Sequence, residues 1–159
     1  MATFDAERWQ ALVDGSACPM CAENAQPDST RRGLVARLPS GNLLLQNDAD
    51  FPGYCVLVHQ RHVTELHDLD AVERAQLIED IAAASRAISA VCRPDKVNYA
   101  ILGNEVPHLH CHVIPRYPYD GYWGAPIWNR PAALRAELPS SKLAELLATL
   151  QHAIGEGAK

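Results

Sequence analysis

The sequence predicts a single α+β domain with a five-stranded, mainly antiparallel sheet packed by helices. Its length of 159 residues is one that a single hydrophobic core usually serves. With 48% hydrophobic and 21% charged residues, the composition is that of an ordinary globular protein. Short apolar segments of strand length are grouped around one long helical segment, and a second long helical segment closes the chain. This grouping is typical of α+β folds.

The first part of the chain contains one short helix and three of the expected strands. In FDAERWQALVDG, the residues from 5 to 13 predict a helix. GLVARLPSGNLLLQN has the pattern of two short strands joined by a turn at Ser40 and Gly41. The valine-rich apolar run GYCVLVH, residues 53–59, predicts a buried strand.

A long helix is predicted from Ala71 to Cys92. Its expected apolar stripe, with spacings of three, seven and three residues, consists of Ile78, Ile81, Ile88 and Val91. Asp70 is followed three residues later by Glu73, which is the pattern of a capping box at the start of a helix. Pro94 is expected to end the helix at its other side.

The remaining elements follow in order. KVNYAIL, residues 96–102, predicts a strand, and a turn at Gly103 and Asn104 leads into a segment rich in histidine. Residues 115–139 contain five prolines and five aromatic residues, and we expect them to form an ordered surface loop. Leucines at helical spacing predict a closing amphipathic helix over residues 140–154.

Charge and targeting signals limit the possible partners. The net charge of −5 argues against a broad, sequence-independent grip on nucleic acid. No apolar run approaches the roughly 20 residues that a membrane helix needs. The first residues, MATFDAERWQALVDG, have neither the basic leader nor the apolar stretch of a secretory signal. We therefore expect a cytoplasmic protein whose five cysteines are reduced thiols, metal ligands or core residues.

Three of the seven histidines lie at alternate positions in NEVPHLHCHVIPRY. In a strand, alternate side chains share one face, so His108, His110 and His112 are expected to point to the same side. The apolar residues between them then point into the core. Neighbouring imidazoles should stand roughly 6.5 Å apart along the strand. A solvated strand face, a metal site and a nucleophilic histidine with neighbouring helpers all fit these residues.

The motif HLHCHVI matches the His-φ-His-φ-His-φ-φ signature, and the sequence resembles the histidine triad (HIT) family of nucleotide hydrolases and transferases. Upstream, GYCVLVHQRHV is similar to the family segment Gly-His-x-Leu-Val-x-Pro-x-x-His-Val. The resemblance implies a HIT-like fold, a homodimer, and a single HIT domain over residues 1–159. Its core would be residues 33–117, preceded by a Cys-x-x-Cys segment over 1–32 and followed by a loop and C-terminal helix over 118–159.

The resemblance also implies a two-step displacement at the α-phosphate of a nucleotide. The middle histidine of the family is the nucleophile, and it corresponds to His110. Its imidazole would form a covalent nucleotidyl-histidine, which water then hydrolyses. His112, one strand step further, would orient the reacting groups and handle the proton at the leaving group. The expected substrates are dinucleoside polyphosphates or nucleoside 5′-phosphate derivatives.

Two alternative functions stay open at this point. A nucleotidyl transferase or phosphorylase would use the same nucleophile with another acceptor, such as inorganic phosphate. A non-catalytic nucleotide-binding zinc protein would need no nucleophile, so the intact His110 argues against it.

Cys18 and Cys21 form a Cys-x-x-Cys motif in ACPMCAE. By itself the motif fits a redox pair, half of a zinc site or two unrelated thiols, and the redox form normally lies in a βαβ pattern that this stretch lacks. Zinc-containing members of the family complete such a pair with two histidines. By this resemblance, the ligands of a structural zinc ion are Cys18, Cys21, His62 and His108, with His59 as a competitor for the third place.

Nucleotide contacts are expected from Asn98, Asn104 and Arg116. The family commonly has amide side chains before the triad, and Arg116 directly after it could supply positive charge. Turn formation by Asn104 and a surface position for Arg116 are the alternatives. Tyr54 stands where the family usually has a histidine, and it fits either an active-site residue or a core aromatic. Weaker candidates, which also fit turns or packing, are Asn47, Asp48, Trp123 and Trp128.

Overall fold

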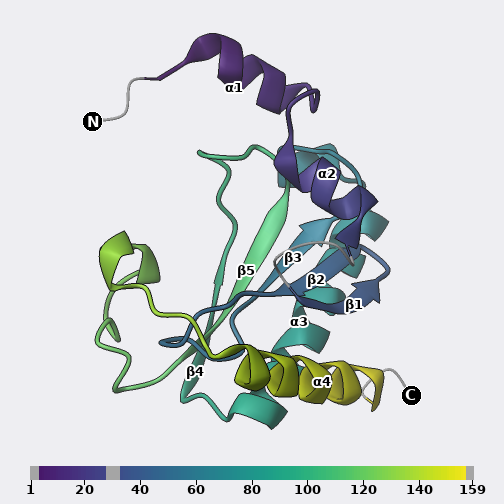
Figure 1. Ribbon diagram of the computed structural model, residues 1–159. Helices are drawn as coiled ribbons and strands as arrows, with labels where there is room; N and C mark the ends of the chain where they lie inside the picture. The colour runs from purple at the N-terminus through teal and green to yellow at the C-terminus, as the bar shows by residue number, and fades with distance from the viewer. Residues whose placement is uncertain (1–3, 28–32, 157–159) are drawn as a thin grey trace.

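A five-stranded antiparallel sheet forms the centre of the protein (Figure 1). The structure is a computed structural model that describes residues 4–27 and 33–156. The strands are β1 (Gly33–Leu38), β2 (Gly41–Leu45), β3 (Cys55–His59), β4 (Lys96–Ala100) and β5 (His110–Arg116). They lie in the order β1-β2-β3-β5-β4, and every neighbouring pair is antiparallel. The predicted α+β fold with five mainly antiparallel strands is confirmed. Residues 1–3 and 28–32 of the expected N-terminal segment, and 157–159 of the C-terminal segment, lie outside the described residues.

Strand β3 lies in the middle of the sheet and is buried on both of its faces. Cys55 and Leu57 point into the core on one side, and Val56 and Val58 point into a second apolar cluster on the other. All five residues of the strand are buried. A strand covered on both faces has no solvent-facing side, which explains the uninterrupted apolar run from Cys55 to Val58.

Two long helices cover one face of the sheet (Figure 1). They are α3 (Ala71–Cys92) and α4 (Ser140–Glu156), and a 3-10 helix, η2 (Leu66–Asp68), precedes α3. Leu150 and Ile154 of α4 are buried in the core between the helices and the sheet. The prediction of a closing amphipathic helix is therefore confirmed.

Helix α3 begins where the sequence predicted. The Asp70 carboxylate accepts hydrogen bonds from the backbone N–H groups of Val72 and Glu73, and the Glu73 carboxylate accepts one from the N–H of Asp70. The predicted capping box is therefore confirmed. At the other end Arg93 adopts the left-handed conformation, with φ of 48°, directly before Pro94, the residue that was predicted to end the helix.

The buried stripe of α3 differs from the prediction at one position. Ile78 is 57% exposed, whereas Ile81 and Ile88 are buried as expected. Leu77 takes the place of Ile78, because the buried residues of the helix recur at spacings of four, three and four residues from Leu77 through Ile81 and Ala84 to Ile88. The buried apolar residues of the helix are Leu77, Ile81, Ala84, Ala87 and Ile88.

The opposite face of the sheet is covered by N-terminal residues and by the segment between β5 and α4. Helix α1 (Ala6–Val13) confirms the predicted first helix, whereas α2 (Pro19–Ala25) was not predicted. With seven residues, α2 is too short to show a repeated apolar spacing. The expected surface loop contains two 3-10 helices, η3 (Ile127–Asn129) and η4 (Ala132–Leu134).

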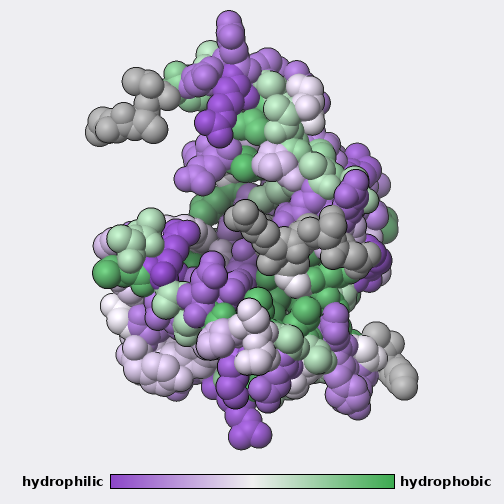
Figure 2. Space-filling view, in the orientation of Figure 1, coloured by the Kyte–Doolittle hydropathy of each residue, from purple (hydrophilic) through white to green (hydrophobic). Residues whose placement is uncertain are grey.

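Hydrophilic and hydrophobic residues are interspersed over the face shown in Figure 2. This face is hollowed between the N-terminal helices and the segment that carries η3. Within residues 4–27 and 33–156, no helix combines the length and the apolar character that a membrane span requires.

Candidate active site and metal centre

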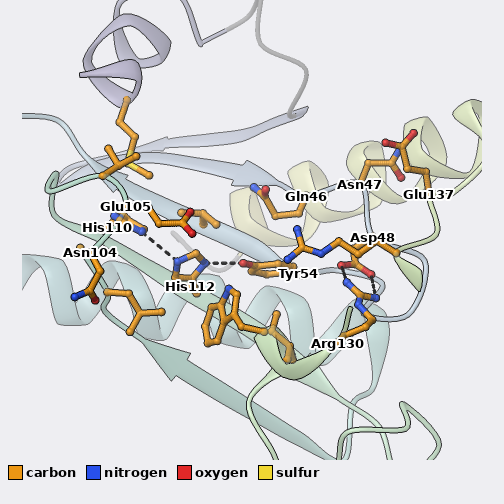
Figure 3. A pocket seen from close by; sticks show the side chains of 18 of the residues that line it. Gln46, Asn47, Asp48, Tyr54, Asn104, Glu105, His110, His112, Arg130 and Glu137 are labelled. Atoms are coloured by element: carbon orange, nitrogen blue, oxygen red, sulfur yellow. Dashed lines mark hydrogen bonds and ion pairs between the residues drawn. The ribbon is translucent and has the colours of Figure 1, made fainter. Parts of the chain in front are cut away.

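The histidine-rich segment is divided between the end of a loop and the start of a strand. Strand β5 begins at His110, so His108 precedes it, whereas the sequence predicted all three histidines on the strand. The apolar residues between the histidines are buried in the core beside α3, as predicted. His110 and His112 lie on the other face of β5, where they line a cavity (Figure 3).

The rings of His110 and His112 lie closer together than strand spacing alone predicts. Their centroids are 4.8 Å apart rather than roughly 6.5 Å, and the ring planes meet at 74°. The rings lean toward each other, which brings the two Nε2 atoms to 3.1 Å. The pair is therefore joined directly by a hydrogen bond.

A backbone carbonyl determines which nitrogen of His110 carries the hydrogen. Nδ1 lies 2.6 Å from the carbonyl oxygen of His108, which can only accept, so Nδ1 is the donor. Neutral His110 then has its lone pair on Nε2 and accepts from Nε2–H of His112. Neutral His112 in turn has its lone pair on Nδ1, which accepts from the Tyr54 hydroxyl at 2.6 Å. Figure 3 shows the three side chains in a row joined by dashed lines.

In this arrangement a neutral His110 has its lone pair on Nε2, which is the form of imidazole that can act as a nucleophile. The cavity beside it has a volume of about 670 Å³, within the range of small-molecule sites. Its walls come from different parts of the chain: Met20 of α2, Asn104 from the loop after β4, and Trp128 of η3. Of the predicted nucleotide-binding residues, Asn104 therefore lies beside the histidines.

Asn98 and Arg116, the other two predicted nucleotide contacts, do not line this cavity. Arg116 is 3% exposed, and its Nε donates to the Asp120 carboxylate at 2.7 Å. The guanidinium also donates to Asn98 Oδ1 at 2.9 Å and to the carbonyl oxygens of Tyr122 and Ala125. Both side chains thus fasten the segment after β5 to β4. In this structure they have this structural role, and their assignment to nucleotide binding stays a prediction.

The electrostatics of the Arg116 site agree with a permanent ion pair. Burial raises the pKa of the Asp120 carboxyl, but hydrogen bonds from Arg116 and from backbone N–H groups outweigh it. The pKa of Asp120 therefore lies below its ordinary value. A guanidinium occupied in this way supplies no free charge for a phosphate.

Arg130 is one of four charged residues lining the cavity that sequence reasoning missed; the others are Glu105, Arg135 and Glu137. Arg130 forms ion pairs with Asp48 and Asp50, which follow β2, and its guanidinium carbon lies 5.0 Å from the centroid of the Phe51 ring. The hydrogen bond to Asp48 is the main reason that the pKa of Arg130 is raised. Because two carboxylates face one guanidinium, this group adds no net positive charge. The partners are 80 or more residues apart in the chain, so no local sequence signal marks them.

Tyr54 and Trp128 both contact the ring of His112. Tyr54 is 8% exposed and packs in the apolar cluster on this face of the sheet, so it is a core aromatic as well as a partner of the site. The Trp128 ring meets the His112 ring edge to face, with centroids 5.1 Å apart. The sequence had left both residues open between packing and function.

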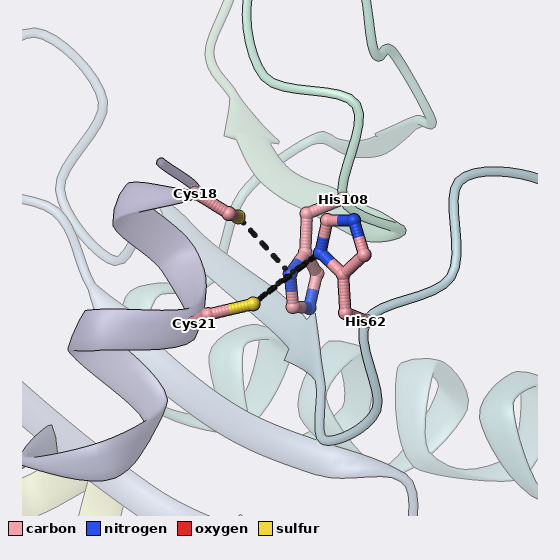
Figure 4. A group of neighbouring side chains, drawn as sticks. All are labelled: Cys18, Cys21, His62 and His108. Atoms are coloured by element: carbon pink, nitrogen blue, oxygen red, sulfur yellow. Dashed lines mark hydrogen bonds between the residues drawn. The ribbon is translucent and has the colours of Figure 1, made fainter. Parts of the chain in front are cut away.

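The four residues predicted to bind zinc lie together where the start of α2 meets the loops beside β3 and β5 (Figure 4). They are positioned to bind a metal, because their ligand atoms all lie within 4.8 Å of one another: Cys18, Cys21, His62 and His108. His59, the competitor, lies outside this group. Its Nδ1 is 3.2 Å from backbone atoms of Arg61.

The distances within this cluster fit a tetrahedral ion. Cys21 Sγ lies 3.3 Å from Nδ1 of His62 and 3.5 Å from Nδ1 of His108. Cys18 Sγ is 3.5 Å from Nδ1 of His108, and the two Nδ1 atoms are 3.3 Å apart. Tetrahedral zinc, with Zn–S of about 2.3 Å and Zn–N of about 2.05 Å, places sulfur about 3.5 Å from nitrogen and two nitrogens about 3.3 Å apart. The residues present therefore fit the metal.

The outer nitrogens of both histidines are held by backbone carbonyls. Nε2 of His62 lies 2.9 Å from the carbonyl oxygen of Val13, and Nε2 of His108 lies 2.7 Å from that of His59. Each Nε2–H therefore donates outward and leaves the lone pair on Nδ1 for a metal. Burial also lowers the pKa of His108, which favours the neutral ring. With all four positions supplied by protein, the site is of the closed, structural type.

The fold and the two sites define a class of protein, and the family comparison agrees. The HIT domain model matches residues 32–119, which is more than half of the chain. The protein belongs to the histidine triad (HIT) family, as its motifs predicted. A histidine triad protein of Bradyrhizobium japonicum has the same fold, with a TM-score of 0.72 and 32% sequence identity. The similarity covers 81% of this chain and 95% of that one.

Two named relatives are similar to part of the chain. An AP-4-A phosphorylase of Mycobacterium tuberculosis is 37% identical over 75 residues, which are 43% of this chain and 38% of that protein. An asymmetrical bis(5′-nucleosyl)-tetraphosphatase of Schizosaccharomyces pombe is 32% identical over 74 residues, 43% of this chain and 41% of that protein. The chain thus spans about two fifths of the length of these relatives.

Proposed function

We propose that the protein is a nucleotide hydrolase that acts on the α-phosphate of dinucleoside polyphosphates or related nucleoside 5′-phosphate derivatives. The observation that carries the proposal is the position of His110, whose Nδ1 donates to a backbone carbonyl and whose Nε2 lies 3.1 Å from Nε2 of His112 beside a cavity of about 670 Å³. The names of the relatives, a phosphorylase and a tetraphosphatase of dinucleoside polyphosphates, support the substrate class. His112 and Asn104 line the same cavity. We assign His112 to proton transfer at the leaving group and Asn104 to nucleotide binding.

The reaction has two displacements in this proposal. First, the lone pair on His110 Nε2 forms an N–P bond, the P–O bond to the leaving group breaks, and the leaving oxygen takes the electron pair and a proton from the imidazolium form of His112. Second, a water oxygen bonds to phosphorus and the N–P electron pair returns to His110, while His112 takes the proton of the water. Covalent catalysis divides one difficult step into two easier ones. A positioned acid or base contributes about 10²–10⁴ in rate.

The test is substitution of the nucleophile. His110→Ala should lower turnover of diadenosine tetraphosphate by at least about 10²-fold, because the N–P bond cannot form. The melting temperature and the affinity for AMP should change little. His152→Ala is the matched control, since His152 lies on the outer surface of α4 with its side chain 75% exposed. Turnover by His110→Ala at the wild-type rate would remove the assigned nucleophile. Intact-mass measurement of acid-quenched protein should reveal the nucleotidyl adduct in wild type.

A phosphorylase is the second candidate, and the similarity to an AP-4-A phosphorylase favours it. It would use the same first step and replace water by inorganic phosphate in the second. The products decide between them: in phosphate buffer a hydrolase releases a nucleoside monophosphate, and a phosphorylase releases a nucleoside diphosphate.

We also propose that the metal is a structural zinc ion held by Cys18, Cys21, His62 and His108. Two thiolates and two imidazoles at tetrahedral distances are a donor set that zinc prefers. Bound zinc would cross-link the N-terminal helices to the segment before β5, and the chemistry at His110 does not pass through it. Pairing as a homodimer is a further proposal, which sedimentation can check. The cytoplasmic location stays a prediction.

A further inference from the structure

Tyr54 is held in one orientation by its backbone and its packing. Gly53, directly before it, has a positive φ of 91°, and a Cβ there would lie 2.4 Å from the sulfur of the last residue of α3. The backbone N–H of Tyr54 donates to the carbonyl of Phe51 at 3.0 Å, and its carbonyl accepts from the N–H of Gln46 at 2.8 Å. With the ring buried in the apolar cluster, the hydroxyl has little freedom to move.

The sheet register places this hydroxyl at His112. Val56 of β3 lies opposite His112 of β5, and Tyr54, two residues before Val56, is on the same face. Tyr54 is therefore the diagonal neighbour of His112, a separation of about 7–8 Å that aromatic side chains can bridge. The result is the 2.6 Å contact between the Tyr54 hydroxyl and His112 Nδ1.

We propose that Tyr54 is a positioning residue for His112, and that its hydroxyl supports both protonation states that His112 needs. This inference rests on the proposed two-step reaction. A hydroxyl can donate one hydrogen bond and accept others, and tyrosine stays neutral near pH 7. The Tyr54 hydroxyl can therefore form a hydrogen bond with His112 Nδ1 whether that nitrogen carries a hydrogen or a lone pair. A carboxylate, which only accepts, would favour one state alone.

The protons balance over the two steps. As the acid, His112 is an imidazolium whose Nδ1–H donates to the Tyr54 oxygen while Nε2–H faces the leaving group. When Nε2 gives its proton to the leaving oxygen, His112 becomes neutral, keeps Nδ1–H on Tyr54, and has its lone pair on Nε2. That lone pair then takes the proton of the attacking water and restores the imidazolium. When His112 is neutral in the resting protein, its lone pair is on Nδ1. The hydrogen bond then runs the other way, from the Tyr54 hydroxyl to Nδ1.

Trp128 contacts the His112 ring from a second side. Its ring meets the His112 ring at 78° with centroids 5.1 Å apart. Aromatic rings that meet at a steep angle at this distance attract each other. His112 thus has a polar partner at Nδ1 and an aromatic partner beside its ring, and both restrict the orientation of the ring.

The contact itself can be tested without substrate by comparing wild type with Tyr54→Phe, which removes one oxygen atom. In ¹⁵N NMR spectra of the purified protein, the His112 Nδ1 resonance should move toward the value of an imidazole nitrogen that accepts no hydrogen bond. Tyr119→Phe is the matched control, because Tyr119 is 82% exposed and lies outside the cavity. An unchanged His112 resonance in Tyr54→Phe would overturn the proposal.

The role in the reaction is tested with a series of AMP esters whose leaving groups range from p-nitrophenol to simple alcohols. Tyr54→Phe should lower kcat by about tenfold or more for the alcohols, which leave only with a proton, and by less than about twofold for p-nitrophenol. KM should be similar across the series. A purely structural role predicts an equal loss for every ester, and that result would also overturn the proposal.

The two arms separate failure of this inference from failure of the proposed function. If wild type cleaves the esters and Tyr54→Phe shows the same dependence on the leaving group, only the role of Tyr54 is wrong. If wild type cleaves no ester and no dinucleoside polyphosphate, the proposed function is wrong, and the positioning role falls with it.

Discussion

Removal of the metal should lower the stability of the fold by several kcal/mol. An ion in the cluster would join Cys18 to His108, which are 90 residues apart. In the chain-entropy treatment of a cross-link, closing a loop of this length stabilises the folded state by about 4.6 kcal/mol. Mass action gives about 2.7–4.1 kcal/mol when free zinc is 100–1,000 times its dissociation constant. The two estimates agree on about 3–5 kcal/mol.

This free energy corresponds to a change in melting temperature that is easily measured. For a chain of this size, each kcal/mol shifts the Tm by about 2–4 °C, so excess chelator should lower it by about 6–20 °C. Circular dichroism melts with and without EDTA are the assay, and added zinc should restore the original Tm. Cys18→Ser should melt at the lower temperature with or without chelator, since one ligand of four is lost.

The control for this experiment is His67→Ala. His67 lies on η2 with its side chain 83% exposed and outside the ligand cluster, so its variant should keep the full response to chelator. Two results would refute the reasoning: a Tm unaffected by chelator in protein that carries one equivalent of zinc, or cleanly purified protein with less than about a tenth of an equivalent.

Two further predictions compare matched pairs of variants by urea denaturation. Leu77→Ala should lower the free energy of unfolding by about 2–5 kcal/mol because its side chain is 1% exposed, whereas the exposed Ile78→Ala should change it by only about 0.5 kcal/mol. Equal losses would show that the helix face is misassigned. Asp120→Asn should cost about 3–5 kcal/mol at pH 7, since it leaves a buried guanidinium unpaired, and Glu145→Gln in an exposed pair less than about 1 kcal/mol. The pKa of Asp120 is lowered in the fold, so its carboxylate stabilises the folded protein at pH values above its ordinary pKa. The difference in free energy of unfolding between wild type and Asp120→Asn should therefore become smaller below about pH 4.

Local sequence patterns predicted the elements of the fold because each pattern reports a local requirement. Alternation in LHCHV predicted that Cys111 and its apolar neighbours face the core, and they do. The Asp70–Glu73 pair predicted the start of α3 for the same reason, since a capping box is made within one turn. Ile78 was assigned to the wrong face because α3 carries alanines and aliphatic residues on several sides, so periodicity alone does not fix its rotation.

The cluster of four possible metal ligands could be predicted from the sequence because motifs of the family contain these residues, whereas the role of His110 as nucleophile stays a prediction. Cys18, Cys21, His62 and His108 were predicted as one set and lie within 4.8 Å of one another. Of the predicted nucleotide contacts, Asn104 lines the cavity, whereas Asn98 and Arg116 do not. Arg116 was suggested as a phosphate contact because it lies close to the triad in the chain. Its guanidinium instead donates hydrogen bonds to Asp120 and to carbonyl groups of the following segment.

The amino-acid sequence by itself determined the strands, the α-helices other than α2, and the membership of the family, because these depend on spacing within short segments. Only the tertiary structure decided which distant side chains complete the site. Tyr54 reaches His112 through the register of β3 with β5, and Arg130 is neutralised by Asp48 and Asp50 from another part of the chain. Such pairings depend on how strands and loops pack in space. No pattern of neighbouring residues indicates which distant side chains will come into contact.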